Sequence, residues 1–105
     1  MIKQFSLTDW FEKLALRVIP YQVYLSLDDT EAAYLVLYKY ETSPEKSWGW
    51  SWSSWLTNLF AGDEFYEKLN YEEKKALDRA LYEYVEKLAN QVPNEKKAEL
   101  QKMIF

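Results

Sequence analysis

Only five glycine and proline residues interrupt this chain of 105 residues, and their spacing limits the elements that it can form. Proline ends a helix at the residue before it and glycine favours turns, so the intervals between these residues are the candidate helices and strands. The chain has no internal repeat and no low-complexity tract, and its length suits one hydrophobic core. We therefore expect a single compact domain over residues 1–105. The five interrupting residues are Pro20, Pro44, Gly49, Gly62 and Pro93.

The first interval predicts an amphipathic helix over residues 7–18. Ser6 is a good N-cap residue, and Asp9 follows it at the third helical position, where an acidic side chain can complete the cap. The apolar residues then recur at the spacing of one helix face. They are Leu7, Trp10, Phe11, Leu14 and Val18.

The second interval favours an antiparallel β-hairpin. Apolar and polar residues alternate over 21–27, and a run of β-branched and aromatic residues covers 32–41. Between them, the segment 28–31 has the length and the composition of a hairpin loop. Both faces of the second strand are apolar, so helices from both ends of the chain are expected to cover the sheet.

Residues 43–60 satisfy two periodicities at once. As a strand, this segment would place Trp48, Trp50 and Trp52 on one face and small residues on the other. As one helix, it would begin with Ser43 as the N-cap and Pro44 at the first position, and its apolar stripe would leave out Trp50. The helix accounts for more of the segment. A strand followed by a short helix is the alternative, and Trp50 is the ring most expected to be exposed.

From Gly62 onward the pattern is helical. Asp63 can cap a short helix that ends near residue 69, Asn70 with Glu73 can cap a long one, and Pro93 starts the last. The predicted fold class is therefore α+β: a small antiparallel β-hairpin or three-stranded sheet packed against an N-terminal helix and several C-terminal helices, with helix dominating.

The residues that most often carry catalysis are missing. The chain has no cysteine and no histidine, which removes the commonest nucleophiles, general bases and soft-metal ligands. Two glycines cannot form a glycine-rich phosphate loop. We expect no enzyme activity, no cofactor and no metal. An acidic loop of Asp28, Asp29 and Glu31 could offer oxygen ligands to a hard cation, but its spacing matches no calcium loop and its residues are ordinary turn formers.

Charge and hydropathy argue against nucleic acid and membrane as partners. Thirteen Lys and Arg residues oppose seventeen Asp and Glu residues, for a net charge of −4. Lys74, Lys75 and Arg79 are interleaved with acidic residues, which is typical of a solvated helix face, so no direct nucleic-acid binding is expected. The longest apolar run is too short to span a membrane, and the charged N-terminal stretch does not resemble a signal peptide. These features predict a cytoplasmic protein without a membrane contact.

Aromatic content gives the main functional hypothesis. Five Trp, nine Tyr and five Phe are more rings than a core of this size usually needs. We expect a non-catalytic protein-interaction module that forms a homodimer or binds another protein through an aromatic surface. The alternatives are a small acidic inhibitor of host nucleic-acid machinery encoded by a virus or mobile element, such as an anti-CRISPR protein, which would use the acidic loop, and a small-ligand or sugar binder that stacks on Trp. In the simplest structural interpretation, most of these rings fill the core. The candidate partner-binding residues are Tyr24, Tyr38, Tyr40, Trp48, Trp50 and Trp52.

Overall fold

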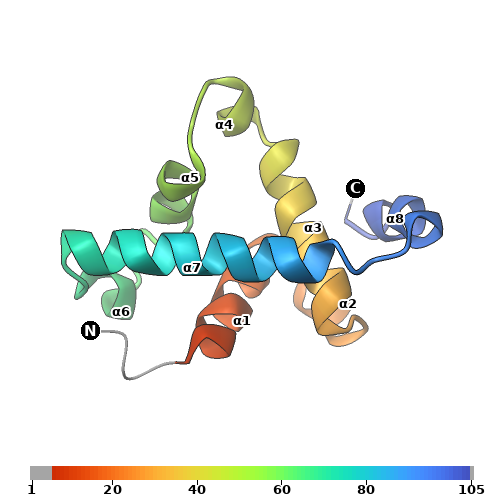
Figure 1. Cartoon of the computed structure of the whole chain (residues 1–105), viewed down its shortest axis with the longest axis horizontal. Coiled ribbons are helices and arrows are strands. Elements are labelled where there is room, and N and C mark those ends of the chain that lie inside the picture. Colours follow the sequence, from red (N-terminus) through yellow and green to blue (C-terminus); the bar gives the residue numbers. More distant parts are fainter. Residues whose placement is uncertain (1–5, 105) are drawn as a thin grey trace.

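The computed structural model describes residues 6–104, and these residues form helices joined by short turns (Figure 1). The helices are α1 (Leu7–Val18), α2 (Tyr21–Leu25), α3 (Asp29–Glu41), α4 (Pro44–Ser47), α5 (Trp52–Leu59), α6 (Glu64–Glu67), α7 (Tyr71–Ala89) and α8 (Asn94–Gln101). No strand occurs within this part of the chain. The fold is therefore all-helical, and the predicted α+β class is wrong.

Helices α3 and α7 form the centre of the molecule. They cross each other, and α1, α5 and α8 pack around them (Figure 1). Both helices contribute fully buried aliphatic side chains to the core, among them Leu35 and Val36 on α3 and Leu77, Leu81 and Val85 on α7. In Figure 1, α3 and α5 converge toward α4, which lies at the top of the view and away from α2 and α8. We call the turn between α4 and α5, residues 48–51, the tryptophan tip.

Three predicted helix starts are confirmed by their caps. Ser6 and Asp9 form a capping box at α1, and Asn70 and Glu73 form another at α7. Asp63 accepts hydrogen bonds from the first backbone N–H groups of α6. Each cap satisfies N–H groups that the helix itself leaves without a partner. These helices start where the local sequence placed them.

The predicted hairpin is replaced by α2 and α3. The expected hairpin loop is a helix start, because Asp28 Oδ1 accepts from Glu31 N at 2.9 Å and Glu31 Oε1 accepts from Asp28 N at 3.0 Å. This Asp-x-x-Glu capping box was visible in the sequence. The residues after it nevertheless did not look helical in the sequence, because α1, α7 and α8 cover α3. A helix buried on several sides is apolar all round and loses its helical periodicity.

Neither interpretation of residues 43–60 is right as a whole. Ser43 and Pro44 do start a helix, but α4 ends after one turn, and Ser51 caps a second helix, α5. Gly49 separates them with a φ of +95°, a conformation that residues with a Cβ atom rarely adopt. The segment is therefore two short helices joined by the tryptophan tip, and not one helix or a strand.

Candidate binding surface at the tryptophan tip

The six candidate aromatic residues do not form one surface. Tyr40 and Trp52 are buried, at 6% and 9% exposure, and Tyr24 and Tyr38 are half-buried on α2 and α3. Trp48 is 70% exposed and Trp50 is 37% exposed. Tyr40 and Trp52 therefore belong to an inner set in the core, Trp48 and Trp50 form an outer pair at the tryptophan tip, and Tyr24 and Tyr38 belong to neither.

The inner set is a closely packed aromatic cluster between α3, α5 and α7. The ring of Trp52 lies 5.3 Å from that of Tyr40, 5.5 Å from that of Trp55 and 5.2 Å from that of Tyr82. The indole N–H of Trp52 donates to the backbone carbonyl of Asp78 at 2.9 Å. These rings stabilise the fold and are not available to a partner.

The outer pair stands on a turn held by hydrogen bonds. Trp48 N donates to the carbonyl of Pro44 at 3.1 Å, and Trp50 N donates to that of Glu45 at 3.0 Å. The hydroxyl of Tyr40, from the inner cluster, donates to the carbonyl of Trp50 at 3.4 Å. Because its backbone is tied to α4 and to the core, the tip presents its indoles on a defined scaffold.

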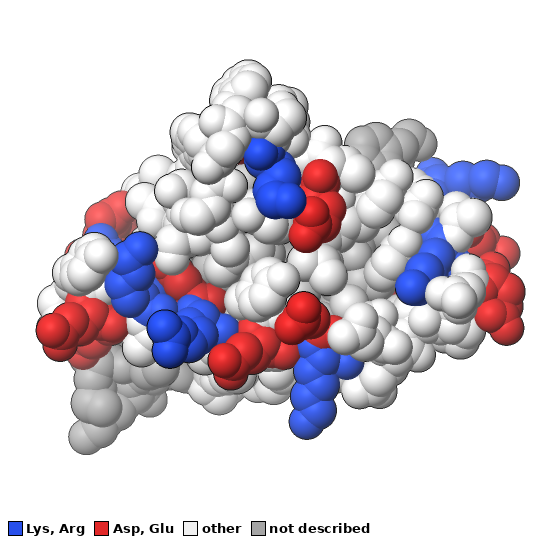
Figure 2. Space-filling view, turned by 45° about the horizontal axis from the view of Figure 1, so that its top comes forward, with Lys and Arg blue, Asp and Glu red and all other residues white. Residues whose placement is uncertain are grey.

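The surface around the tip carries little charge. Figure 2 shows the upper part of the molecule as mostly uncharged, apart from one adjoining pair of opposite sign. Lys46 and Glu41 form an ion pair of 2.9 Å next to the tip and so compensate each other. Exposed apolar side chains rimmed by polar ones are typical of interaction surfaces.

A groove beside Trp50 runs between α5 and α7. Its main hollow has a volume of about 460 Å³, and an adjoining hollow of about 420 Å³ continues it along α7. We call the two hollows together the α5–α7 groove. Trp50, Ser53, Ser54, Asn58 and Lys75 line the main hollow, and Lys75, Asp78, Arg79 and Tyr82 line the adjoining one.

Asp78 lies beneath this groove and is the one buried charged residue among residues 6–104. Its carboxylate accepts hydrogen bonds from Ser53 Oγ at 2.8 Å and from the Tyr66 hydroxyl at 3.2 Å. Burial raises the pKa of Asp78 above its ordinary value, although these two hydrogen bonds act in the opposite direction. Burial, with the nearby Asp78 charge, raises the pKa of Tyr66 to about 12. The network joins α5, α6 and α7.

The structure places the interleaved charges of α7 on different sides. Asp78 points inward, Glu73 caps the helix, and Lys74 lies 3.5 Å from Glu67. Lys75 and Arg79 line the groove. Their interleaving with acidic residues predicts a mixed solvated face, but the structure buries Asp78 and uses Glu73 as a cap, which spacing in the sequence could not show.

The acidic loop is used by the fold. Asp28 and Glu31 form the capping box of α3, and Glu31 Oε2 is 2.8 Å from Lys96 Nζ. A hydrogen bond from the Thr30 hydroxyl, together with the Glu31 backbone N–H, lowers the pKa of Asp28. Asp29 is exposed. Within the described residues, no group of three or more acidic side chains is placed to hold a metal ion.

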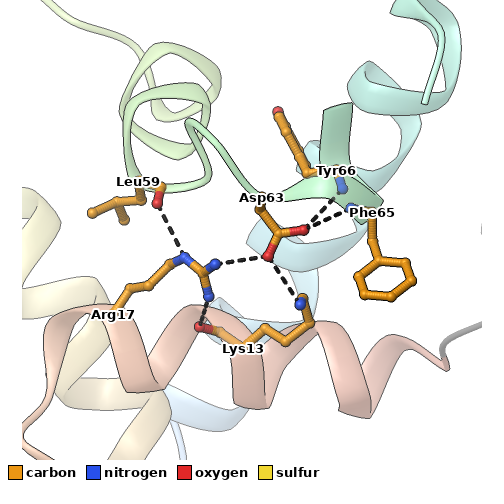
Figure 3. Close-up of polar contacts among 6 residues, drawn as sticks. All are labelled: Lys13, Arg17, Leu59, Asp63, Phe65 and Tyr66. Carbon is orange, nitrogen blue, oxygen red and sulfur yellow. Dashed lines mark hydrogen bonds and ion pairs between the residues drawn. The ribbon is translucent and has the colours of Figure 1, made fainter. Parts of the chain in front are cut away.

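A second polar cluster ties α1 to the segment before α6 (Figure 3). Asp63 Oδ2 lies 2.7 Å from Arg17 Nη2 and 2.9 Å from Lys13 Nζ, while Oδ1 accepts from the N–H groups of Phe65 and Tyr66 at 3.0 Å each. Partial burial acts to raise the pKa of Asp63, but the Lys13 hydrogen bond, the Tyr66 N–H and the two cations outweigh it, and the pKa is lowered.

The contacts of Asp63 leave no group free for a ligand. Arg17 also donates to the carbonyls of Leu59 and Lys13, at 3.1 and 3.0 Å. The sequence predicted the cap but not its cations, since nothing local connects residues 13 and 17 with residue 63. The cluster is structural.

Comparisons with known proteins return nothing for this chain. No protein-family model, no curated protein and no solved structure matches it. Within the part that the structure describes, no helix has the length and apolar character needed to cross a membrane. The tryptophan tip and the α5–α7 groove are therefore the features from which a function can be inferred.

Proposed function

We propose that this protein is a non-catalytic protein-interaction module that uses the tryptophan tip as its docking surface and Trp48 as the anchor. The supporting observation is the 70% exposure of Trp48 on a turn held by backbone hydrogen bonds. No described contact of the Trp48 side chain serves the fold. Trp50 extends the same surface toward the α5–α7 groove.

The energetics of an exposed indole favour this function. A Trp side chain can bury roughly 150–250 Å², at about 25 cal/mol per Å² of apolar surface. Docking Trp48 into a partner's pocket would therefore recover on the order of 3 kcal/mol. Tryptophan is also among the residues enriched at the energetic centres of interfaces. A rigid turn reduces the side-chain and loop ordering that binding must otherwise overcome.

The first occupant to test is a second copy of the chain. Sedimentation equilibrium over a range of concentrations should show a mass that approaches twice that of the chain, and Trp48→Ala should return it to that of the monomer. Tyr21→Ala is the matched control, because Tyr21 is 63% exposed on α2, away from the tip. It should leave the association unchanged.

A different protein partner is the second form of the proposal. If the wild type stays monomeric, protein captured from the source organism's lysate should be lost with Trp48→Ala and kept with Tyr21→Ala. A monomer whose two variants capture the same proteins as the wild type contradicts the proposed function. The cytoplasmic location expected from the sequence belongs to this proposal, and cell fractionation tests it.

The acidic-inhibitor alternative gains no support from its expected site. Asp28 and Glu31 already accept hydrogen bonds or ion pairs within the fold. Asp29 alone offers a single exposed charge, which is too little to imitate a phosphate backbone.

A further inference from the structure

We propose that the α5–α7 groove binds a small ligand that combines a flat ring with a phosphate group, of the chemical class of a nucleoside monophosphate. The ring would stack on the indole of Trp50, and the phosphate would bind Lys75 and Arg79. This site uses Trp50 of the tryptophan tip but not Trp48, the proposed anchor of the docking surface. It therefore does not depend on the proposed docking function.

Two cations of α7 are available to an anion. Lys75 and Arg79 are one helical turn apart, so their side chains are neighbours and can reach one phosphate. Among residues 6–104, neither forms an ion pair within 4 Å; the Lys75 ammonium lies 5.4 Å from the Tyr71 ring, and its charge acts to lower the pKa of Asp78. Figure 2 shows Lys and Arg side chains over the N-terminal half of α7, with Asp and Glu side chains beside them. Charge-assisted hydrogen bonds from such groups are strong phosphate contacts.

Among the described residues, no acidic one lines the main hollow, at the Trp50 end of the groove. Asp78 lines the adjoining hollow with Lys75 and Arg79, but it is only 3% exposed and its oxygens already accept hydrogen bonds from Ser53 and Tyr66. Glu83 lies one turn beyond Arg79 and lines a separate hollow farther along α7. The main hollow itself has Lys75 as its only charged lining residue among those described.

Trp50 supplies the flat wall. Its backbone is held by Glu45 and Tyr40, while 37% of the residue is exposed, so the indole is positioned and still accessible. Aromatic faces of this kind stack on nucleobases. The hollow of about 460 Å³ is within the range that small ligands occupy.

The free hydrogen-bonding groups distinguish this ligand from a neutral sugar. The Asn58 amide has no described side-chain partner and can donate or accept, whereas Lys75 and Arg79 can only donate, so donors outnumber acceptors among these three side chains. The hydroxyls of Ser53 and Ser54 are engaged with Asp78 and Ser51. A sugar needs acceptors as well as donors, whereas a phosphate needs donors alone.

The test uses the full chain labelled with ¹⁵N, in which each of the five indole N–H groups gives its own NMR signal. AMP should shift the Trp50 indole signal saturably, with that signal identified by its loss in Trp50→Phe. Adenosine, which lacks the anion, and inorganic phosphate, which lacks the ring, should each bind at least about tenfold more weakly. Glucose should produce no saturable shift.

The variants locate the phosphate contact. Lys75→Gln combined with Arg79→Gln should weaken AMP binding by about tenfold or more, since it removes two charge-assisted donors. Lys87→Gln, an exposed cation farther along α7, is the matched control and should not change it. Circular dichroism checks that each variant keeps its helices. Trp48→Ala should leave AMP binding intact, which separates this site from the docking surface.

Several results would overturn the proposal. One is the lack of a saturable Trp50 shift at millimolar AMP, and another is equal binding of AMP and inorganic phosphate. AMP binding that survives the Lys75 and Arg79 substitutions would exclude the assigned contact. A Trp50 shift with glucose but not with AMP would assign the groove to neutral sugars instead.

Discussion

The two halves of the tryptophan segment, residues 48–51 and 52–55, have similar residue types but differ in the burial of their tryptophans. Trp48 and Trp50 lie outside on the tip, whereas Trp52 and Trp55, only a few residues later, lie in the aromatic core. Serine or glycine separates the first three of them in the same alternating pattern. The difference arises from the backbone, because Gly49 breaks the helix and Ser51 starts a new one.

This comparison shows that ring content alone does not define an interaction surface. The inner rings contact Tyr40 and Tyr82, while Trp48 and Trp50 make no described ring contact and stand on a turn held by backbone hydrogen bonds. Substitutions in the inner half should therefore change stability, and substitutions in the outer half should change binding.

Trp52→Ala should lower the free energy of unfolding by about 3–5 kcal/mol. The substitution removes ring contacts with Tyr40, Trp55 and Tyr82 and the hydrogen bond to the Asp78 carbonyl. Urea denaturation followed by circular dichroism measures the change. A loss below about 0.5 kcal/mol, the usual size for an exposed site, would show that the two halves are not distinct.

Gly49→Ala should cost about 1–2 kcal/mol, because an L side chain is strained at a φ of +95° even though the added Cβ would meet no atom within 4 Å. Gly62→Ala is the matched control, with a φ of +85° and the same open surroundings. Thermal denaturation should show similar losses for both. Only Gly49→Ala should also alter binding through Trp48, and an equal effect of both on binding would argue against a role for the tip geometry.

The pH dependence of stability should have opposite signs at Asp78 and Asp63. The pKa of Asp78 is raised in the folded state, so its proton is held more tightly there than in the unfolded chain. Its contribution to stability therefore decreases as the pH rises from below 3.8 through the raised pKa. The wild type should lose stability relative to Asp78→Asn over this window, as measured by urea denaturation at several pH values.

Asp63 provides the contrast. Its pKa is lowered in the folded state, so its contribution is present above the ordinary value of 3.8 and is lost as the pH falls through the lowered pKa. The wild type should therefore lose stability relative to Asp63→Asn on acidification. If both variants shift the curve in the same direction, the assignment of these two environments is wrong.

Trp48→Ala should change the free energy of unfolding by no more than about 0.5 kcal/mol, because the side chain is largely exposed. The same variant is expected to lose the association of the proposed docking surface. Calorimetry or urea denaturation measures the change in stability, and sedimentation measures the loss of association. A large loss of stability would place Trp48 with the inner rings.

Capping residues in the sequence predicted where helices begin, because a cap is a hydrogen bond between residues only three positions apart. The helix starts at Ser6 and Asn70 depend on side chains three residues apart, so the sequence displays them directly. The β-hairpin was wrong because α3 is apolar on several sides, and that pattern reflects neighbours distant in the sequence. At the candidate site, the exposed ring expected from the sequence was Trp50, and the structure exposes Trp48 still more.

The sequence by itself determined the absence of cysteine and histidine chemistry, the surplus of aromatic rings and the residues at which most helices begin, because these are properties of composition and of short-range hydrogen bonding. Only the tertiary structure decided which rings are buried, that Asp78 turns inward while Lys75 and Arg79 line a groove, and that Asp63 is tied to α1. Each of these depends on how helices distant in sequence pack, and burial is a property of that packing rather than of residue type.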